Sequence, residues 1–337
     1  LEVIRRIERA GAATKADIVI TEIGGTVGEY QNILFLEAVR MLKVHRPGDV
    51  LVVLVSHVPA LGVGGTELKT KPTQYAARSL NSAGLQADVI IARAGVPMDK
   101  KRKEKIAENC NLREQDVISA PDVKSIYDVP VNFEKDRLSD RILQKLGVAP
   151  RGHDLKEWKG LARQMHTACT PARIAVVGKY FGSGHFVLTD SYISVLEAIK
   201  HAAAAVKRTP VIEWIDAEEF EKNPAGLKML ETYAGIIVPG GFGSRGVEGK
   251  IAAIQHCREH KIPCFGLCYG MQLMTVEFAR HVAKMDGAHT TEVDPKTKYP
   301  VIDILPEQKK NLEQKNYGAT MRLGAYPAIL KKTTVAH

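Results

Sequence analysis

The stretch Gly266-Leu267-Cys268-Tyr269-Gly270 combines residue types and a spacing that suit nucleophilic chemistry. A short apolar run precedes it and an amphipathic segment follows it, which predicts a strand, a sharp turn and a helix. Glycines two residues before and two after a cysteine are typical of a nucleophile elbow, a strained turn that needs small neighbours. We therefore predict that Cys268 is a nucleophile. A helix beginning at Tyr269 would point its N-terminal dipole at the sulfur, which favours the thiolate, and its free N–H groups could hold an oxyanion.

A second glycine-rich loop follows another apolar segment. The loop is Val238-Pro239-Gly240-Gly241-Phe242-Gly243-Ser244-Arg245-Gly246, and it comes directly after Ala234-Gly235-Ile236-Ile237. Its bare backbone can donate hydrogen bonds, and two such loops at neighbouring strand tips form an active-site crevice. A buried structural cysteine is the alternative reading of Cys268.

Two motifs in the first half of the chain suggest nucleotide binding. In Thr21-Glu22-Ile23-Gly24-Gly25-Thr26-Val27-Gly28-Glu29-Tyr30, a carboxylate ends an apolar stretch ahead of three glycines. A carboxylate at a strand tip suits Mg²⁺ held jointly with nucleotide phosphates. The stretch Glu67-Leu68-Lys69-Thr70-Lys71-Pro72-Thr73-Gln74 offers groups for phosphate and base contacts. The alternatives are a glycine-rich turn with a solvated glutamate and an ordinary surface loop.

The elements that must position these motifs alternate between apolar strands and amphipathic helices. In chain order we expect strands at 16–22, 49–56 and 87–92, a helix at 33–43, a strand at 174–178, a helix at 190–206 and a strand at 211–215. This alternation predicts an α/β fold with two doubly wound domains and mainly parallel sheets. We place the first domain at 1–146, a polar linker at 147–171 and the second domain at 172–337.

Composition limits the class of protein. Of the 337 residues, 45% are hydrophobic and 25% are charged, as in ordinary globular proteins, and no apolar run approaches the roughly 18 residues of a membrane span. This composition predicts a cytoplasmic protein. The five cysteines are odd in number and include no C-x-x-C pair, which argues against a disulfide framework or a zinc site and predicts reduced thiols. The net charge of +9 fits anionic nucleotides better than nucleic acid, because the basic run Lys100-Lys101-Arg102-Lys103 has no interleaved aromatic residues.

Together the motifs resemble known families. P-G-G-F-G and G-L-C-Y-G-M-Q are similar to class I glutamine amidotransferases, which implies a glutaminase. With E-I-G-G-T-V-G-E and K-T-K-P-T-Q in this order, nearly the whole chain resembles the CTP synthase family. The resemblance implies a P-loop-like amidoligase domain that phosphorylates UTP with ATP and Mg²⁺, then substitutes ammonia from the attached glutaminase to give CTP. It also implies activation by GTP, inhibition by CTP and a homotetramer. The alternatives are another class I amidotransferase and a filament or scaffold subunit without catalysis.

The resemblance further implies roles for individual residues. Glu22 matches the Mg²⁺ carboxylate and Cys268 the glutaminase nucleophile. Contacts with UTP or CTP are implied for Glu29, Tyr30, Gln31, Lys69, Thr70, Lys71, Pro72, Thr73, Gln74 and Lys105. Contacts with ATP are implied for Asp122 and Val123. Contacts with glutamine or its oxyanion are implied for Gly241, Tyr269, Gly270, Met271, Gln272 and Glu292.

Two family elements do not occur in the printed sequence. No G-x-x-x-x-G-K-[ST] phosphate loop is present, and none of the eleven histidines is followed two residues later by an acidic residue. A class I glutaminase needs a histidine base oriented by a carboxylate. We therefore expect the phosphate loop upstream of Leu1 and the base beyond His337, so that this fragment alone is inactive.

Overall fold

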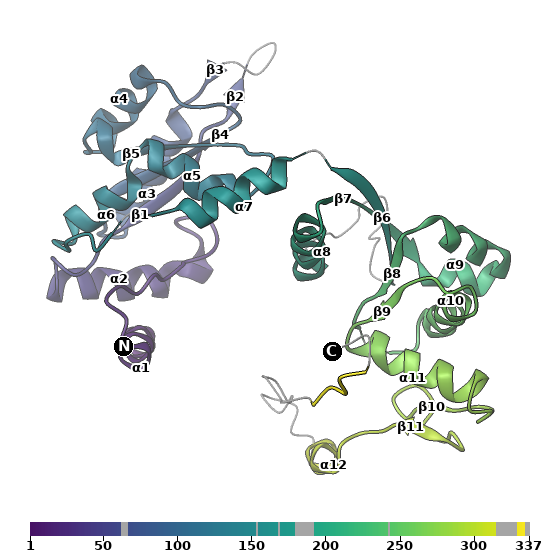
Figure 1. Cartoon of the computed structure of the whole chain (residues 1–337). Coiled ribbons are helices and arrows are strands. Elements are labelled where there is room, and N and C mark those ends of the chain that lie inside the picture. The colour runs from purple at the N-terminus through teal and green to yellow at the C-terminus, as the bar shows by residue number, and fades with distance from the viewer. Residues whose placement is uncertain are drawn as a thin grey trace. The chain divides into compact units, whose positions relative to one another are not determined.

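The structure is a computed structural model that describes residues 1–61, 67–152, 154–167, 169–178, 192–241, 243–314 and 329–333. The chain divides into two compact units, Leu1–Thr167 and Ala168–His337. The division falls inside the segment 147–171 that we expected to be a linker. That segment contains helix α7 (Lys156–His166), which belongs to the first unit (Figure 1).

The first unit is built on a parallel sheet with the strand order β1-β4-β5. Its strands are β1 (Val53–His57), β4 (Val89–Ala94) and β5 (Val117–Pro121). Leu54 pairs with Ile90, which pairs with Val117, so continuous aliphatic runs form the sheet. Such runs are expected where both faces are buried. A short antiparallel pair, β2 (Ala60–Leu61) and β3 (Glu67–Leu68), follows β1.

Helices cover both faces of this sheet (Figure 1). One buried cluster joins Ile90 and Ala92 of β4 to Ala77 and Ile106, and a second joins Val89 to Leu138. The helices of the unit are α1 (Glu2–Thr14), α2 (Ile33–His45), α3 (Lys71–Ser82), α4 (Lys100–Asn109), α5 (Asp128–Lys135), α6 (Leu138–Lys145) and α7, with 3-10 turns η1 (Tyr30–Asn32) and η2 (Glu114–Asp116). The unit is therefore doubly wound.

The expected strand at 16–22 is not formed. The segment is irregular and exposed, and Ile20 is 93% accessible to solvent. A strand exists only when another strand satisfies its backbone N–H and C=O groups, and no described strand pairs with this segment. The prediction of a buried strand at 16–22 was therefore wrong.

The second unit contains a parallel sheet with the strand order β7-β6-β8-β9. Its strands are β6 (Thr170–Gly178), β7 (Arg208–Asp216), β8 (Gly235–Val238) and β9 (Cys264–Gly266). β6 and β7 begin before the expected 174 and 211, because their first residues pair in register from Thr170 with Arg208 onward. A separate two-stranded parallel sheet holds β10 (His289–Thr290) and β11 (Pro300–Ile302).

Alternate residues of β6 face opposite helical layers. Val176 packs with Ile199 of one helix, whereas Ala175 and Val177 pack with Ala253 of another. The helices are α8 (Ile193–Ala205), α9 (Ala217–Lys222), η4 (Pro224–Thr232), α10 (Val247–Glu259), α11 (Tyr269–His281) and α12 (Pro306–Glu313). Both units are therefore α/β, with mainly parallel sheets between helices, as the sequence predicts.

The far end of α11 is fixed to α10 by a buried ion pair. Arg258 donates to both carboxylate oxygens of Glu277 at 2.8–3.1 Å, and the His281 ring lies 3.2 Å from the same carboxylate. Glu277 is 1% exposed, and a buried charge is costly unless it is paired. These neighbours provide the pairing. No helix in the described part of the chain is both long and apolar enough to cross a membrane.

Candidate active sites

Cys268 lies in a sharp turn between β9 and α11. The Leu267 amide donates to the Val238 carbonyl of the neighbouring strand at 2.9 Å, and the Gly270 amide turns back to the Leu267 carbonyl at 2.8 Å. Cys268 has φ 51° and ψ −106°, and it caps the N-terminus of α11. Positive φ in a residue with a side chain is strained and costs about 1–3 kcal/mol. The thiol is exposed, as the predicted nucleophile elbow requires.

The glycines around Cys268 are required by close backbone contacts. A Cβ at Gly266 would lie 2.6 Å from the carbonyl carbon of Gly270, and a Cβ at Gly270 would lie 2.0 Å from the Val238 carbonyl oxygen. No ordinary side chain is accommodated at such distances. The elbow motif is therefore explained by geometry, with α11 lying directly against the end of β8.

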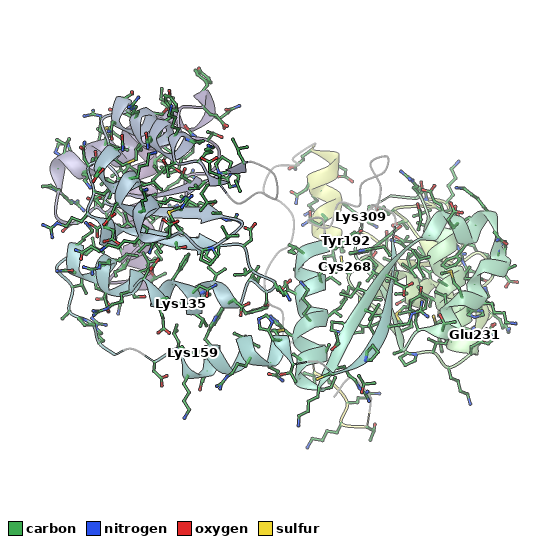
Figure 2. All side chains as sticks on the ribbon, turned by 90° about the horizontal axis from the view of Figure 1, so that it is seen from above. Lys135, Lys159, Tyr192, Glu231, Cys268 and Lys309 are labelled. Carbon is green, nitrogen blue, oxygen red and sulfur yellow. The ribbon has the colours of Figure 1, made fainter. Side chains whose placement is uncertain are left out.

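The loop after β8 lies beside the cysteine. A Cβ at Gly240 would be 3.4 Å from the Cys268 Cβ and 3.8 Å from its Sγ. The Tyr192 hydroxyl donates to the Gly240 carbonyl at 3.4 Å, and Figure 2 labels Tyr192 and Cys268 close together. The predicted oxyanion residue Gly241 is the next residue of this loop. The carboxyl ends of β8 and β9 thus bring the two predicted loops together.

Glu292 joins this group through the same loop. The Gly243 amide donates to the Glu292 carboxylate at 2.7 Å, and the Tyr269 hydroxyl donates to the Gly243 carbonyl at 3.0 Å. Burial, with a smaller effect from the Glu292 charge, raises the pKa of Tyr269 to about 12, so its hydroxyl remains a donor. Of the other predicted glutamine contacts, Met271 is exposed and Gln272 is half-buried.

A second candidate site, in the first unit, gathers cationic side chains around one carboxylate. The Lys69 ammonium lies 2.5 Å from the Glu67 carboxylate. The pKa of Glu67 is lowered mainly by its hydrogen bond with Lys69, and the charges of Arg102 and Lys105 lower it further. Lys69 and Lys105 were both predicted contacts for UTP or CTP. This cluster follows β1, at the carboxyl edge of the parallel sheet, where ligands of such folds bind.

The rest of the predicted Lys-Thr-Lys-Pro-Thr-Gln segment divides into exposed and buried residues. Lys71 and Pro72 are exposed at the start of α3. Thr70, Thr73 and Gln74 are buried and bonded within the protein: the Ser56 hydroxyl donates to Thr73 at 2.9 Å, and Gln74 donates to Thr70 at 3.2 Å. The bond between Thr73 and Ser56 joins α3 to β1, and the bond between Gln74 and Thr70 holds the first turn of the helix beside Lys69 and Lys71.

Glu22 is exposed in the irregular segment before the glycines, not at a strand tip. A single carboxylate fits Mg²⁺ only when nucleotide phosphates and water supply the other oxygens. In the part of the chain that the structure describes, the group of three possible metal ligands is Glu231, His256 and His260 in the second unit. No second protein ligand for Mg²⁺ is thus identified beside Glu22 among these residues. Glu29, Tyr30 and Gln31 are exposed beside this segment, and Tyr30 is 90% accessible.

The predicted ATP contacts lie just after β5. The Asp122 amide donates to the Ala94 carbonyl at 2.8 Å, and its carboxylate pairs with Arg93 of β4 at 3.2 Å. Asp122 is exposed and Val123 is half-buried. Both residues therefore lie at the carboxyl edge of the sheet, as does the lysine cluster.

Several residues of these sites were not predicted. Asn32 is 5% exposed and donates to the Thr26 carbonyl at 2.7 Å and the Gly24 carbonyl at 3.5 Å, so it organises the glycine turn. Gly240 packs against Cys268, and the Gly243 amide donates to Glu292. Arg102 contributes its positive charge beside Glu67. The basic run from Lys100 to Lys103 was the feature of the sequence that could have pointed to Arg102. The roles of Asn32 and Gly240 depend on distances that a sequence does not contain.

Comparison with known proteins matches both units. Residues 1–148 match the family described as CTP synthase N-terminus, and residues 187–335 match glutamine amidotransferase class-I. A solved structure titled "Trypanosoma brucei CTPS - glutaminase domain with bound acivicin" is 38% identical, covering 40% of this chain and 50% of that one at a TM-score of 0.37.

Whole-chain relatives give the same result. A CTP synthase of Pyrococcus abyssi is 46% identical over 337 residues, which are 100% of this chain and 60% of that protein. A CTP synthase of Geobacillus kaustophilus is 44% identical over 338 residues, 100% of this chain and 62% of that protein. The chain thus spans about 60% of the length of these relatives. The two domain matches and the identity over the whole of this chain make it similar to the CTP synthase family.

Proposed function

We propose that this chain is part of a glutamine-hydrolysing CTP synthase, which aminates UTP with ATP and with ammonia released from glutamine. The observation that carries the proposal is the strained, exposed Cys268 at the junction of β9 and α11, beside the loop after β8. A scaffold without catalysis would have no need of positive φ at a cysteine. The relatives of the full chain are called CTP synthases, which disfavours another class I amidotransferase.

In the glutaminase step, the Cys268 thiolate attacks the side-chain amide carbon of glutamine. The carbonyl oxygen becomes an oxyanion, which we assign to the amides near Gly241 and Tyr269 because those of Gly270 and Gln272 donate to turn carbonyls. The C–N bond then breaks, and a proton from a general acid accompanies departing ammonia. Water hydrolyses the resulting thioester to glutamate and regenerates the thiol. We propose a histidine as this general acid.

Glu292 is proposed to bind the α-amino group of glutamine. Its carboxylate accepts from the Gly243 amide and lies in one hydrogen-bonded group with the loop that follows β8. A carboxylate with one oxygen held by an amide keeps lone pairs for an ammonium group. Met271 and Gln272, on the first turn of α11, are proposed to line the substrate.

In the synthetase step, Lys69 and Lys105 are proposed to bind the triphosphate of UTP or CTP, with Arg102 close by. The other UTP and CTP contacts are assigned to Glu29, Tyr30, Gln31 and the segment from Thr70 to Gln74, and the ATP contacts to Asp122 and Val123. Glu22 would hold Mg²⁺, whose role is to neutralise phosphate charge. GTP activation, a homotetramer and a cytoplasmic location remain proposals from the family.

The test is made on the complete protein. Cys268→Ala should abolish CTP formation from glutamine but leave CTP formation from added ammonia largely intact, because the two steps use different units. Cys169→Ala, a half-buried cysteine at the start of β6, is the matched control and should keep both activities. Equal loss of both activities in Cys268→Ala would contradict the assignment of Cys268 to glutamine hydrolysis.

The 337-residue chain expressed as printed gives a second test. We expect almost no glutamate release from glutamine, since none of its histidines carries the acidic residue expected of the catalytic pair. Turnover comparable with a complete amidotransferase would show that one of the eleven histidines acts as the base, and our assignment of the triad would be wrong.

A further inference from the structure

Two histidines and a glutamate meet on the second unit, away from Cys268. Glu231 belongs to η4, His256 to α10, and His260 is the residue that ends α10. One ligand atom from each lies within 4.8 Å of the others. Glu231 precedes β8 and both histidines precede β9, so the cluster lies at the amino edge of the sheet, opposite the elbow. Figure 2 labels Glu231 and Cys268 well apart.

The distances between these atoms fit a shared metal ion. A Glu231 carboxylate oxygen lies 3.3 Å from His256 Nε2 and 4.0 Å from His260 Nε2. Ligands bound to zinc at about 2.0–2.2 Å in a tetrahedron are separated by roughly 3.3–3.6 Å. The two distances from Glu231 are therefore close to those expected around a shared ion, and the main adjustment needed is a rotation of one imidazole ring.

Hydrogen bonding leaves the correct nitrogens available. The Nδ1 atom of His260 lies 2.9 Å from the His256 carbonyl, and a carbonyl only accepts, so Nδ1 carries the proton and Nε2 keeps its lone pair. A histidine ligand usually donates its second ring N–H to such a group. The His256 Nε2 atom is buried and makes no hydrogen bond with any described residue. A metal ion would satisfy both nitrogens.

The backbone that carries the ligands is held by core packing. Leu230, the neighbour of Glu231, is fully buried in the same cluster as Ala253 and Cys257, which flank His256 on α10. The histidine rings stack with centroids 3.9 Å apart and planes 24° apart, so one ring must rotate about its Cβ–Cγ bond before both Nε2 lone pairs point at one ion. The preorganisation of the site therefore lies in its backbone, which loses little conformational freedom on binding.

We propose that Glu231, His256 and His260 form a Zn²⁺ site that cross-links η4 to α10. Imidazole nitrogen and carboxylate oxygen suit zinc, whereas Mg²⁺ and Ca²⁺ prefer oxygen alone. With three protein ligands, the fourth position is left to water. Without a metal ion, the group would form ordinary histidine–glutamate ion pairs, each of which requires a protonated imidazole.

The test uses isothermal titration calorimetry with ZnCl₂ on the full chain carrying Cys268→Ala, so that the exposed thiol cannot bind metal. In this background, Glu231→Gln and His260→Ala should each lower zinc affinity at least about tenfold, since losing even an outer partner of a ligand costs about 10–100-fold. Both side chains are partly exposed, at 40% and 46%, so these variants should fold, which circular dichroism verifies.

The matched control is His166→Ala in the first unit. The His166 ring is also paired with a carboxylate, that of Asp128 at 2.7 Å. Among the described residues, however, His166 belongs to no group of three possible metal ligands. This variant should bind zinc like the background protein. The proposal would be overturned if the background protein bound no zinc, or if Glu231→Gln and His260→Ala bound zinc as tightly as the background protein does. Co²⁺ bound in place of zinc should show no thiolate charge-transfer band, and such a band would assign the metal to a cysteine instead.

Discussion

Gly270 offers the sharpest test of the elbow, because one methyl group there collides with backbone. In Gly270→Ala, the new Cβ would lie 2.0 Å from the Val238 carbonyl oxygen and 2.9 Å from its carbon. Real Cβ atoms are almost never closer than 3.0 Å to such atoms, so α11 and β8 must separate by about 1 Å. This movement displaces the turn that holds Cys268.

Two opposing effects set the size of the change. Replacing glycine by alanine in a helix favours folding by up to about 1 kcal/mol. Forcing extra volume against backbone costs about 3 kcal/mol, the upper part of the range for overpacking. The net destabilisation is about 2 kcal/mol or more, which for a unit of this size lowers the melting temperature by roughly 4–8 °C.

The assay combines urea denaturation with the rate of Cys268 alkylation by iodoacetamide, located by peptide mapping. Gly249→Ala is the matched control, because its Cβ would lie 1.9 Å from the Ala217 carbonyl oxygen in the contact between α9 and α10. We expect both variants to lose stability but only Gly270→Ala to alkylate more slowly in native buffer. Gly160→Ala in α7 meets nothing within 4 Å and should be at least as stable as wild type.

The close contact of α11 with β8 would be refuted if the free energy of unfolding of Gly270→Ala lay within about 0.5 kcal/mol of wild type. That is the range of ordinary surface substitutions. Equal slowing of alkylation in Gly249→Ala would show that the thiol responds to general loosening of the unit. The role of Gly270 in holding the turn would then be unsupported.

Three further predictions concern other parts of the chain. Cys268→Gly should be about 1 kcal/mol more stable to urea than Cys268→Ala, since only glycine adopts φ 51° and ψ −106° without strain, and equal stability would argue against strain at the elbow. In the complete protein, Lys69→Ala should weaken the binding of UTP and of CTP alike by roughly tenfold, because both nucleotides carry the triphosphate. Replacing the exposed Lys100 by alanine should change neither affinity. Titration with each nucleotide measures these affinities, and unchanged values in Lys69→Ala would remove Lys69 from the site. The pKa of Asp303 is lowered from 3.8 to about 2 by hydrogen bonds from Lys309, Thr291 and the Ile304 amide. The stabilisation from these bonds is therefore complete above about pH 4 and is lost as the pH falls through 2. An NMR titration that gave an ordinary pKa for this carboxyl group would contradict the prediction.

Local features of the sequence were sufficient to predict the elbow. Gly266 and Gly270 flank the cysteine within five residues, and their requirement comes from contacts with Val238 and within the turn itself. The parallel α/β architecture also followed from alternating apolar runs. Features of this kind are encoded in short segments, so one sequence contains the necessary information.

Features that depend on distant partners were predicted less well. The run from 16 to 22 has strand composition but no described strand to pair with. The whole segment from Lys69 to Gln74 was predicted to contact nucleotide, and the sequence did not distinguish its exposed lysines from Thr73, which is buried against Ser56. The cluster proposed to bind zinc could not be found from cysteine spacing, because it consists of two histidines four residues apart and a glutamate 25 residues before the first of them.

The buried cysteines give each unit an internal reporter of unfolding. Cys110 is 2% exposed in the core of the first unit, and Cys257 is 0% exposed in the core of the second. Burial raises the pKa of Cys110, and the adjacent Cys264 thiol, together with burial, raises that of Cys257. Neither sulfur should react until its own unit opens, whereas Cys268 reacts in the native state. Pulsed labelling of one sample would thus measure two separate opening free energies and show whether the first and second units unfold together or independently.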